Sequence, residues 1–178
     1  AMEQMFQATS DMIDQRMRKV WKDTTEITAL SVVIAGECSK LAQDEVALAS
    51  LVHKLGSLPV LTYAEENDQL ISDGISLDKI TNQLHPALGK YILTKWEFPE
   101  VFSDVPATYR KLDADNASLQ YSDIIRAAYL VNNKGNANGW GKKDWSEVPA
   151  MVKLGLVDND ELVERILEKA VEAKNALS

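Results

Sequence analysis

Residues 23–42 read DTTEITALSVVIAGECSKLA, and the spacing of their apolar side chains predicts a buried α-helix. Small or apolar residues recur there at intervals of three and four: Ile27, Leu30, Ser31, Ile34, Cys38 and Leu41. These positions cover a wide arc of a helix. We therefore expect this segment to be central to the fold and buried on more than one side.

The same periodicity continues on both sides of this segment, and alternating apolar and polar runs bounded by hairpin turns are absent from the sequence. The sequence therefore predicts an all-α, multi-helix protein with at least seven helices, which a sheet of three or more strands would contradict. The helices are expected at residues 9–21, 23–42, 44–55, 58–66, 76–83, 86–96, 99–111, 119–132, 145–154 and 158–176.

Composition limits the classes of function. A chain of 178 residues can bury a core of its own, and a single cysteine, Cys38, excludes an intrachain disulfide and favours a reducing, cytoplasmic location. Apolar runs are far shorter than the roughly 20 residues that cross a bilayer, so no membrane span is expected. The net charge of −8 and the scattered basic residues make nucleic acid an unexpected partner.

Two segments carry the candidate chemistry. The first is ASLVHKLG at residues 49–56, in which an apolar helix ends in His53 and Lys54. It resembles the metal-binding signature of HD-domain phosphohydrolases, except that Lys54 stands at the aspartate position. The second is HPALGKYILTKWEFPE at residues 85–100, which resembles the H-x-x-x-G-x-x-L-x-x-x-W-x-x-P stretch of HDOD domains, non-catalytic relatives of the HD and HD-GYP hydrolases.

The resemblance implies an HD-domain-like helical bundle from a bacterial source, and the order of its motifs extends from about Met12 to the C-terminus. Residues 21–178 are expected to form the HD-like domain. Residues 1–20 are expected to form an N-terminal helix, the remnant of a missing N-terminal subdomain. Loss of that subdomain would expose an apolar patch of more than roughly 400 Å² near this helix, with Met2, Met5, Phe6 and Met12, and self-association would cover it.

The metal-ligand set implied by the resemblance is incomplete. A lysine offers only donors and a positive charge, so Lys54 repels a divalent cation where aspartate would bind it. Asp23 occupies the segment that resembles the family's first ligand helix, where no histidine is present. The vestigial-site candidates are Asp23, His53, Lys54, His85 and Asp123. We therefore expect no bound metal, no cofactor and no catalytic residue.

Each histidine also has a purely structural explanation. His53 can end a core helix with its ring bonded to a neighbouring carbonyl. His85 precedes Pro86, where a local capping or packing role is typical.

Three functions remain open. The leading hypothesis is a signal-transduction or regulatory module that binds a protein partner, or the missing subdomain, without catalysis. The alternative is a metal-dependent phosphohydrolase acting on a nucleotide or cyclic dinucleotide, with Asp23, His53, His85 and Asp123 as ligands. In the third, Lys54 anchors a phosphate and the pocket senses a nucleotide without cleaving it. Homo-oligomers are compatible with all three.

Overall fold

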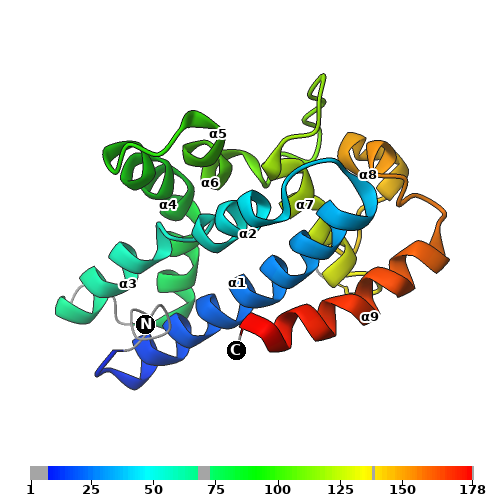
Figure 1. Ribbon diagram of the computed structural model, residues 1–178. Coiled ribbons are helices and arrows are strands. Elements are labelled where there is room, and N and C mark those ends of the chain that lie inside the picture. Colours follow the sequence, from blue (N-terminus) through cyan, green and yellow to red (C-terminus); the bar gives the residue numbers. More distant parts are fainter. Residues whose placement is uncertain (1–7, 68–72, 138, 178) are drawn as a thin grey trace. The chain divides into compact units, whose positions relative to one another are not determined.

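The computed structural model describes residues 8–67, 73–137 and 139–177, and within these ranges every regular element is a helix and none is a strand (Figure 1). The expectation of an all-α protein with at least seven helices is confirmed. The elements are α1 (Asp11–Cys38), α2 (Gln43–Val52), α3 (Ser57–Glu66), α4 (Gly74–Lys95), α5 (Glu100–Ser103), α6 (Val105–Thr108), α7 (Tyr121–Asn132), the 3-10 turn η2 (Trp145–Glu147), α8 (Pro149–Lys153) and α9 (Asp160–Leu177).

The chain divides into two compact units. The first contains Ala1–Thr24 and Val52–Ala107, and the second contains Thr25–Leu51 and Thr108–Ser178. Each unit is thus made of two separate stretches of chain, and α1 contributes residues to both.

Two helices are longer than the sequence predicts. The expected break between helices 9–21 and 23–42 is wrong, because α1 runs without interruption from Asp11 to Cys38. No glycine or proline occurs near the expected break, so nothing there ends a helix. The expected start at Pro86 is also wrong: Pro86 lies inside α4, whose packing against α3 outweighs the backbone hydrogen bond that proline cannot make.

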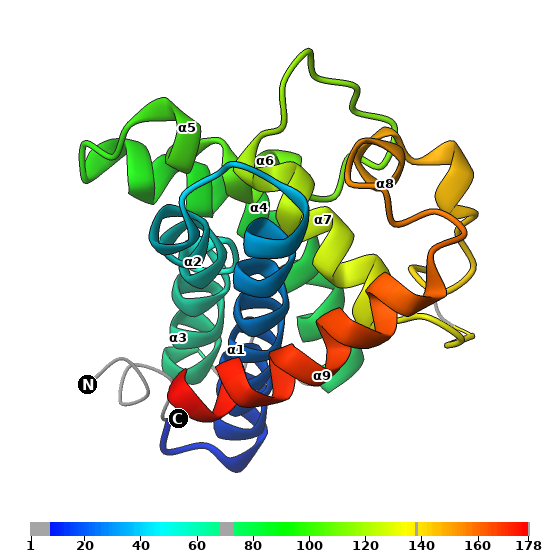
Figure 2. The same cartoon turned by 45° about the vertical axis from the view of Figure 1, so that its right-hand side comes forward.

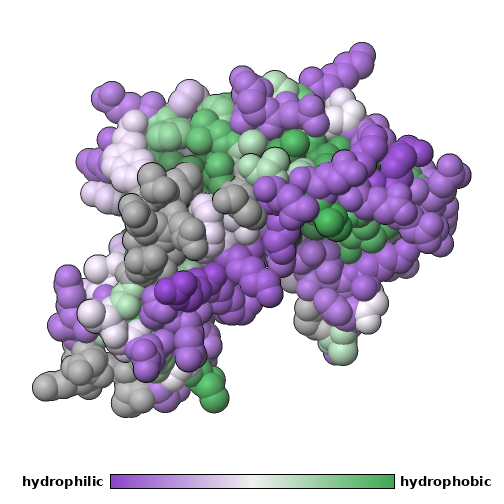
Figure 3. Space-filling model, turned by 60° about the horizontal axis from the view of Figure 1, so that its bottom comes forward, coloured by the Kyte–Doolittle hydropathy of each residue, from purple (hydrophilic) through white to green (hydrophobic). Residues whose placement is uncertain are grey.

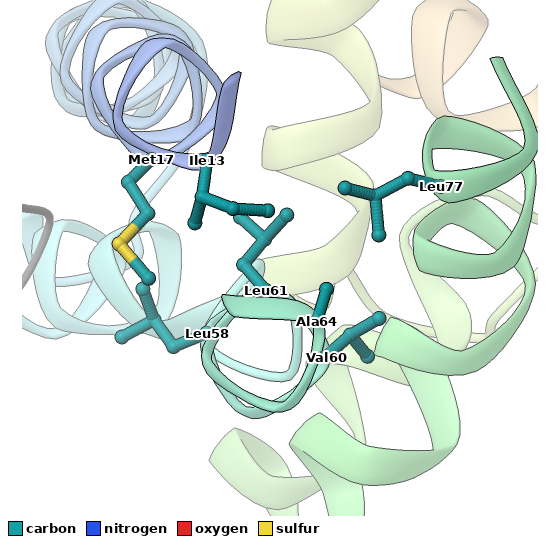
Figure 4. Packing of buried hydrophobic residues seen from close by; sticks show 7 residues of the cluster. All are labelled: Ile13, Met17, Leu58, Val60, Leu61, Ala64 and Leu77. Carbon is teal, nitrogen blue, oxygen red and sulfur yellow. The ribbon is translucent and has the colours of Figure 1, made fainter. Parts of the chain in front are cut away.

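The core of the first unit joins three helices. Ile13 and Met17 of α1 meet four residues of α3 (Leu58, Val60, Leu61 and Ala64), and Leu77 of α4 closes the cluster (Figure 4). Every one of these seven residues is buried. Met12, which was expected on an exposed patch, is instead half-buried and packs against this cluster, whereas Met2, Met5 and Phe6 lie outside the described residues.

Two glycines allow close contacts between α4 and its neighbours, the turn after α2 and α6. Residues 53–56 form this turn, and a Cβ on Gly56 would collide with the backbone carbonyl of His85 and lie 2.5 Å from the backbone nitrogen of Gly89. A Cβ on Gly89 would in turn lie 2.8 Å from Cβ of Pro106. Only glycine allows such close approaches, so Gly56 fixes the position of the turn on α4, and Gly89 lets Pro106 of α6 pack against α4.

The second unit is built around α7, in which ten consecutive residues from Ser122 to Val131 are buried. The ring of Tyr129 stacks on Tyr109 at 5.3 Å and on Trp140 at 4.8 Å between centroids, so aromatic contacts hold the loops around α7. Helix α9 runs beside the second half of α1 (Figure 1), where Lys174 donates to Glu26 at 2.8 Å and Arg165 to Glu37 at 3.0 Å. Figure 2 shows α7 and α9 of this unit from another side.

One described stretch, Gln43–Glu66, is long and apolar enough to pass for a membrane span by composition, with a mean hydropathy of 1.2 over its apolar window. Half of that window is buried within the protein, and the stretch consists of α2, the following turn and α3. Such burial is typical of core helices. On the face drawn in Figure 3, hydrophilic side chains cover much of the described surface and apolar ones are grouped in separate patches.

We expect Gly56→Ala to destabilise the protein by about 1–3 kcal/mol, because the added methyl group forces the turn away from His85 and Gly89. Urea unfolding followed by circular dichroism measures the change. Gly139→Ala is the matched control, because a Cβ at Gly139 meets no atom within 4 Å. Equal midpoints for the two variants would show that the close approach does not matter.

A carboxylate from α3 holds the start of α1. Oε1 of Glu65 accepts hydrogen bonds from the backbone N–H of Thr9 at 2.6 Å and of Ser10 at 3.0 Å, and from the Thr9 hydroxyl at 2.8 Å. The hydrogen bond from Ser10, followed by those from Thr9, lowers the pKa of Glu65 below its ordinary value.

A lowered folded-state pKa means that this contribution to stability is present above the ordinary glutamate pKa and is lost as pH falls through the folded value. We therefore expect Glu65→Ala to destabilise the protein at pH 7 and to have a smaller effect at pH 3. Thermal melts at both pH values measure this difference. An effect of the same size at both would contradict the role of the ionised carboxylate.

Candidate functional site

A cavity of about 120 Å³ lies in the first unit, beside the turn at residues 53–56. Residues of α1, the turn, α3 and α4 line it. Its charged or titratable residues are Arg16, Lys19, Asp23, Lys54, Asp78 and His85. The structure thus brings three of the five predicted site residues, Asp23, Lys54 and His85, to one cavity.

Asp23 faces two ammonium groups. Its Oδ2 lies 2.9 Å from Nζ of Lys19, one helical turn earlier on α1, and 3.6 Å from Nζ of Lys54. The Lys19 side chain is largely exposed, whereas that of Lys54 is only 20% exposed. Lys54 therefore places a partly buried positive charge beside the carboxylate that the resemblance suggested as a metal ligand.

A second ion pair also lines the cavity. Nε and Nη2 of Arg16 donate to the two carboxylate oxygens of Asp78 at 2.8 and 3.2 Å, and Nη1 donates to the carbonyl of Met12 at 3.0 Å. This pairing ties α1 to α4 with the two-pronged geometry that guanidinium groups favour. Sequence analysis missed both residues, because a contact across 62 positions leaves no local pattern.

The two histidines differ in their access to the cavity. His53 is fully buried in the turn after α2, which agrees with a structural role at the end of a core helix. His85 is buried within α4 and lines the cavity. Of the expected capping or packing roles of His85, capping is excluded, since His85 lies in mid-helix and Asp73 caps α4 by accepting a hydrogen bond from the Ser76 N–H. The burial of His85 agrees with packing. Within the described ranges, no three His, Cys, Asp or Glu side chains are arranged to hold a metal ion.

Asp123 belongs to the second unit and is a structural residue there. It is buried at the start of α7, where Oδ2 accepts the Gln120 N–H at 2.8 Å and Oδ1 accepts a hydrogen bond from Nη1 of Arg126. Arg126 is itself fully buried, and its Nη2 donates to the carbonyl of Thr108 at 2.9 Å. The carboxylate of Asp123 is thus engaged as a helix cap and as the partner of a buried guanidinium.

Comparison with known proteins gives two matches. The sequence model of the HDOD domain matches residues 1–111, which include the whole first unit, whereas the motifs were expected to extend to the C-terminus. The crystal structure of a "Putative metal-dependent phosphohydrolase" from Shewanella amazonensis SB2B is similar, with a TM-score of 0.84 and 25% sequence identity. The match covers 99% of this chain and 65% of the Shewanella chain. Among curated proteins, none matches.

We expect Arg126→Met to destabilise the protein by about 3–5 kcal/mol, because it leaves the Asp123 carboxylate buried without its cationic partner. The matched control is Lys153→Met, which removes an exposed pair with Asp115 and should cost at most about 1 kcal/mol. Chemical denaturation measures both. A loss for Arg126→Met no larger than for the control would contradict the structural assignment of Asp123.

Proposed function

This chain belongs to the HDOD domain family, and on that basis we propose that it is a bacterial cytoplasmic regulatory module that acts in signal transduction by binding, without hydrolysing phosphate esters. One observation carries the proposal: the Asp23 carboxylate is shared by the ammonium groups of Lys19 and Lys54. Metal-dependent hydrolysis would need this carboxylate for a divalent ion.

Electrostatics favours the binding role. Two unit charges 4 Å apart interact by about 4 kcal/mol near a protein surface, so an ammonium repels a divalent cation at that distance by about 8 kcal/mol. Because Lys54 is largely buried beside Asp23, it cannot turn into water as easily as the exposed Lys19. A metal ion at Asp23 would therefore have to displace Lys54 from its place in the cavity wall.

The proposed partner is a protein, which includes a second copy of this chain or a further subdomain. Large apolar side chains that are exposed on the first unit support this class of partner, since aromatic residues dominate the binding energy of protein interfaces. Tyr91 and Trp96, at the end of α4, and Val101, in α5, are 60%, 58% and 52% exposed.

The alternative function is a metal-dependent phosphohydrolase. Two observations favour it: the similarity to the Shewanella protein, which bears that name, and the presence of Asp23 and His85 on the same cavity. In this alternative those two residues would ligate the ion and Lys54 would contact the phosphate.

We expect the purified protein to bind Mn²⁺, Ni²⁺ or Zn²⁺ no more tightly than its Asp23→Asn variant, and to leave phosphomonoesters and cyclic dinucleotides intact. The reason is the positive charge of Lys54 beside Asp23. Elemental analysis after dialysis and a phosphate-release assay with each metal test the two statements.

Lys54→Met is the matched control for this experiment, because it removes the ammonium and keeps an unbranched side chain that is one atom shorter. If the charge is what excludes metal, this variant binds divalent ions more tightly than the wild-type protein. One equivalent of metal per wild-type chain, lost in Asp23→Asn, together with phosphate release, would establish the hydrolase instead.

A further inference from the structure

We infer that the cavity beside Asp23 is a binding site for a phosphate-sized oxyanion, with Lys54 and Arg16 as its anchoring residues. The inference deepens the proposed function, since it gives the regulatory module a small ligand, and it rests on that proposal in requiring that Asp23 holds no metal.

Size restricts the ligand. Pockets that enclose drug-sized molecules have volumes of about 300–1,000 Å³, whereas this cavity measures about 120 Å³. A whole nucleotide therefore cannot be enclosed. A phosphate group fits, either as inorganic phosphate or as the terminal group of a nucleotide whose sugar and base stay outside.

The sign of the charge selects an anion. Arg16, Lys19 and Lys54 contribute three positive charges to the cavity, and Asp23 and Asp78 contribute two negative ones, which leaves one positive charge in excess. The whole chain, by contrast, has a net charge of −8. A positive concavity on an acidic protein concentrates small anions at that place.

The donors are suited to oxygen ligands. The side chains of Arg16 and Lys54 are only 22% and 20% exposed, so their interactions with an anion are less screened than those of surface cations. Ser57 and Asn82 line the same cavity and can donate further hydrogen bonds. Guanidinium and ammonium groups together form the usual recognition set for phosphate.

Asp23 limits the affinity. Its carboxylate already neutralises the Lys54 ammonium at 3.6 Å, so an incoming oxyanion must replace Asp23 as the partner of that lysine. The wild-type site is therefore weak, with a dissociation constant of about 1 mM, and reports millimolar changes in its ligand. Because Asp23 and the oxyanion compete for Lys54, removal of the Lys54 ammonium should weaken anion binding and removal of the Asp23 carboxylate should strengthen it.

The experiment is a titration of the metal-free protein in low-chloride buffer, followed by NMR or calorimetry. The probes are inorganic phosphate, AMP and adenosine. We expect saturable binding of phosphate or AMP and none of adenosine. If AMP binds at least as tightly as phosphate, the natural source is a nucleotide; if phosphate alone binds, the source is free phosphate. Equal binding of adenosine and AMP would overturn the inference.

Variants assign the binding to this cavity. Lys54→Met should weaken phosphate binding at least tenfold, and Asp23→Asn should strengthen it about tenfold, because the competing carboxylate is lost. Lys169→Met, which removes a lysine of the second unit, should leave binding unchanged. Circular dichroism shows whether each variant is folded, and the Asp23→Asn result is decisive if Lys54→Met does not fold.

No saturable binding up to about 20 mM phosphate, or weaker binding by Asp23→Asn, would overturn the inference. Different observations would contradict the proposed function, namely a bound metal ion and the release of phosphate from esters. If a metal ion at Asp23 held the phosphate, Asp23→Asn would abolish phosphate binding. The anion site without metal predicts the opposite, because Asp23→Asn then strengthens phosphate binding.

Discussion

The close approach of two backbones determines the candidate site. The turn at residues 53–56 contacts α4 at His85 and Gly89, and this approach needs a glycine at position 56. The contact brings Lys54 of the turn and His85 of α4 to the cavity that Asp23 also lines. The glycine at the end of segment 49–56 is therefore explained by packing against α4.

The sequence predicted local structure well and long-range contacts poorly. Helical periodicity identified the all-α class and the boundaries of α7 and α9 to within two residues. It failed around Trp21, where no residue ends α1, and at Pro86, where the proline suggested a helix start that tertiary packing overrides. Proline in particular predicts a helix start only when no neighbouring helix stabilises the chain on both sides of it.

The site was predicted only where its residues stand in local sequence patterns. Lys54 and His85 were found because they stand in recognisable segments, and the contact between Asp23 and Lys19 follows from a spacing of four on one helix. The pairing of Arg16 with Asp78 had no such signal. Asp123 has a capping position and a buried arginine three residues later, but burial of Arg126 cannot be inferred from its charge.

The division of the chain also bears on how such a protein can evolve. Each unit consists of two segments, and the chain passes between the units after Thr24, Leu51 and Ala107. A single recombination point therefore cannot transfer one unit without part of the other. A fusion that keeps both units intact must therefore move them together, even though each has its own buried residues.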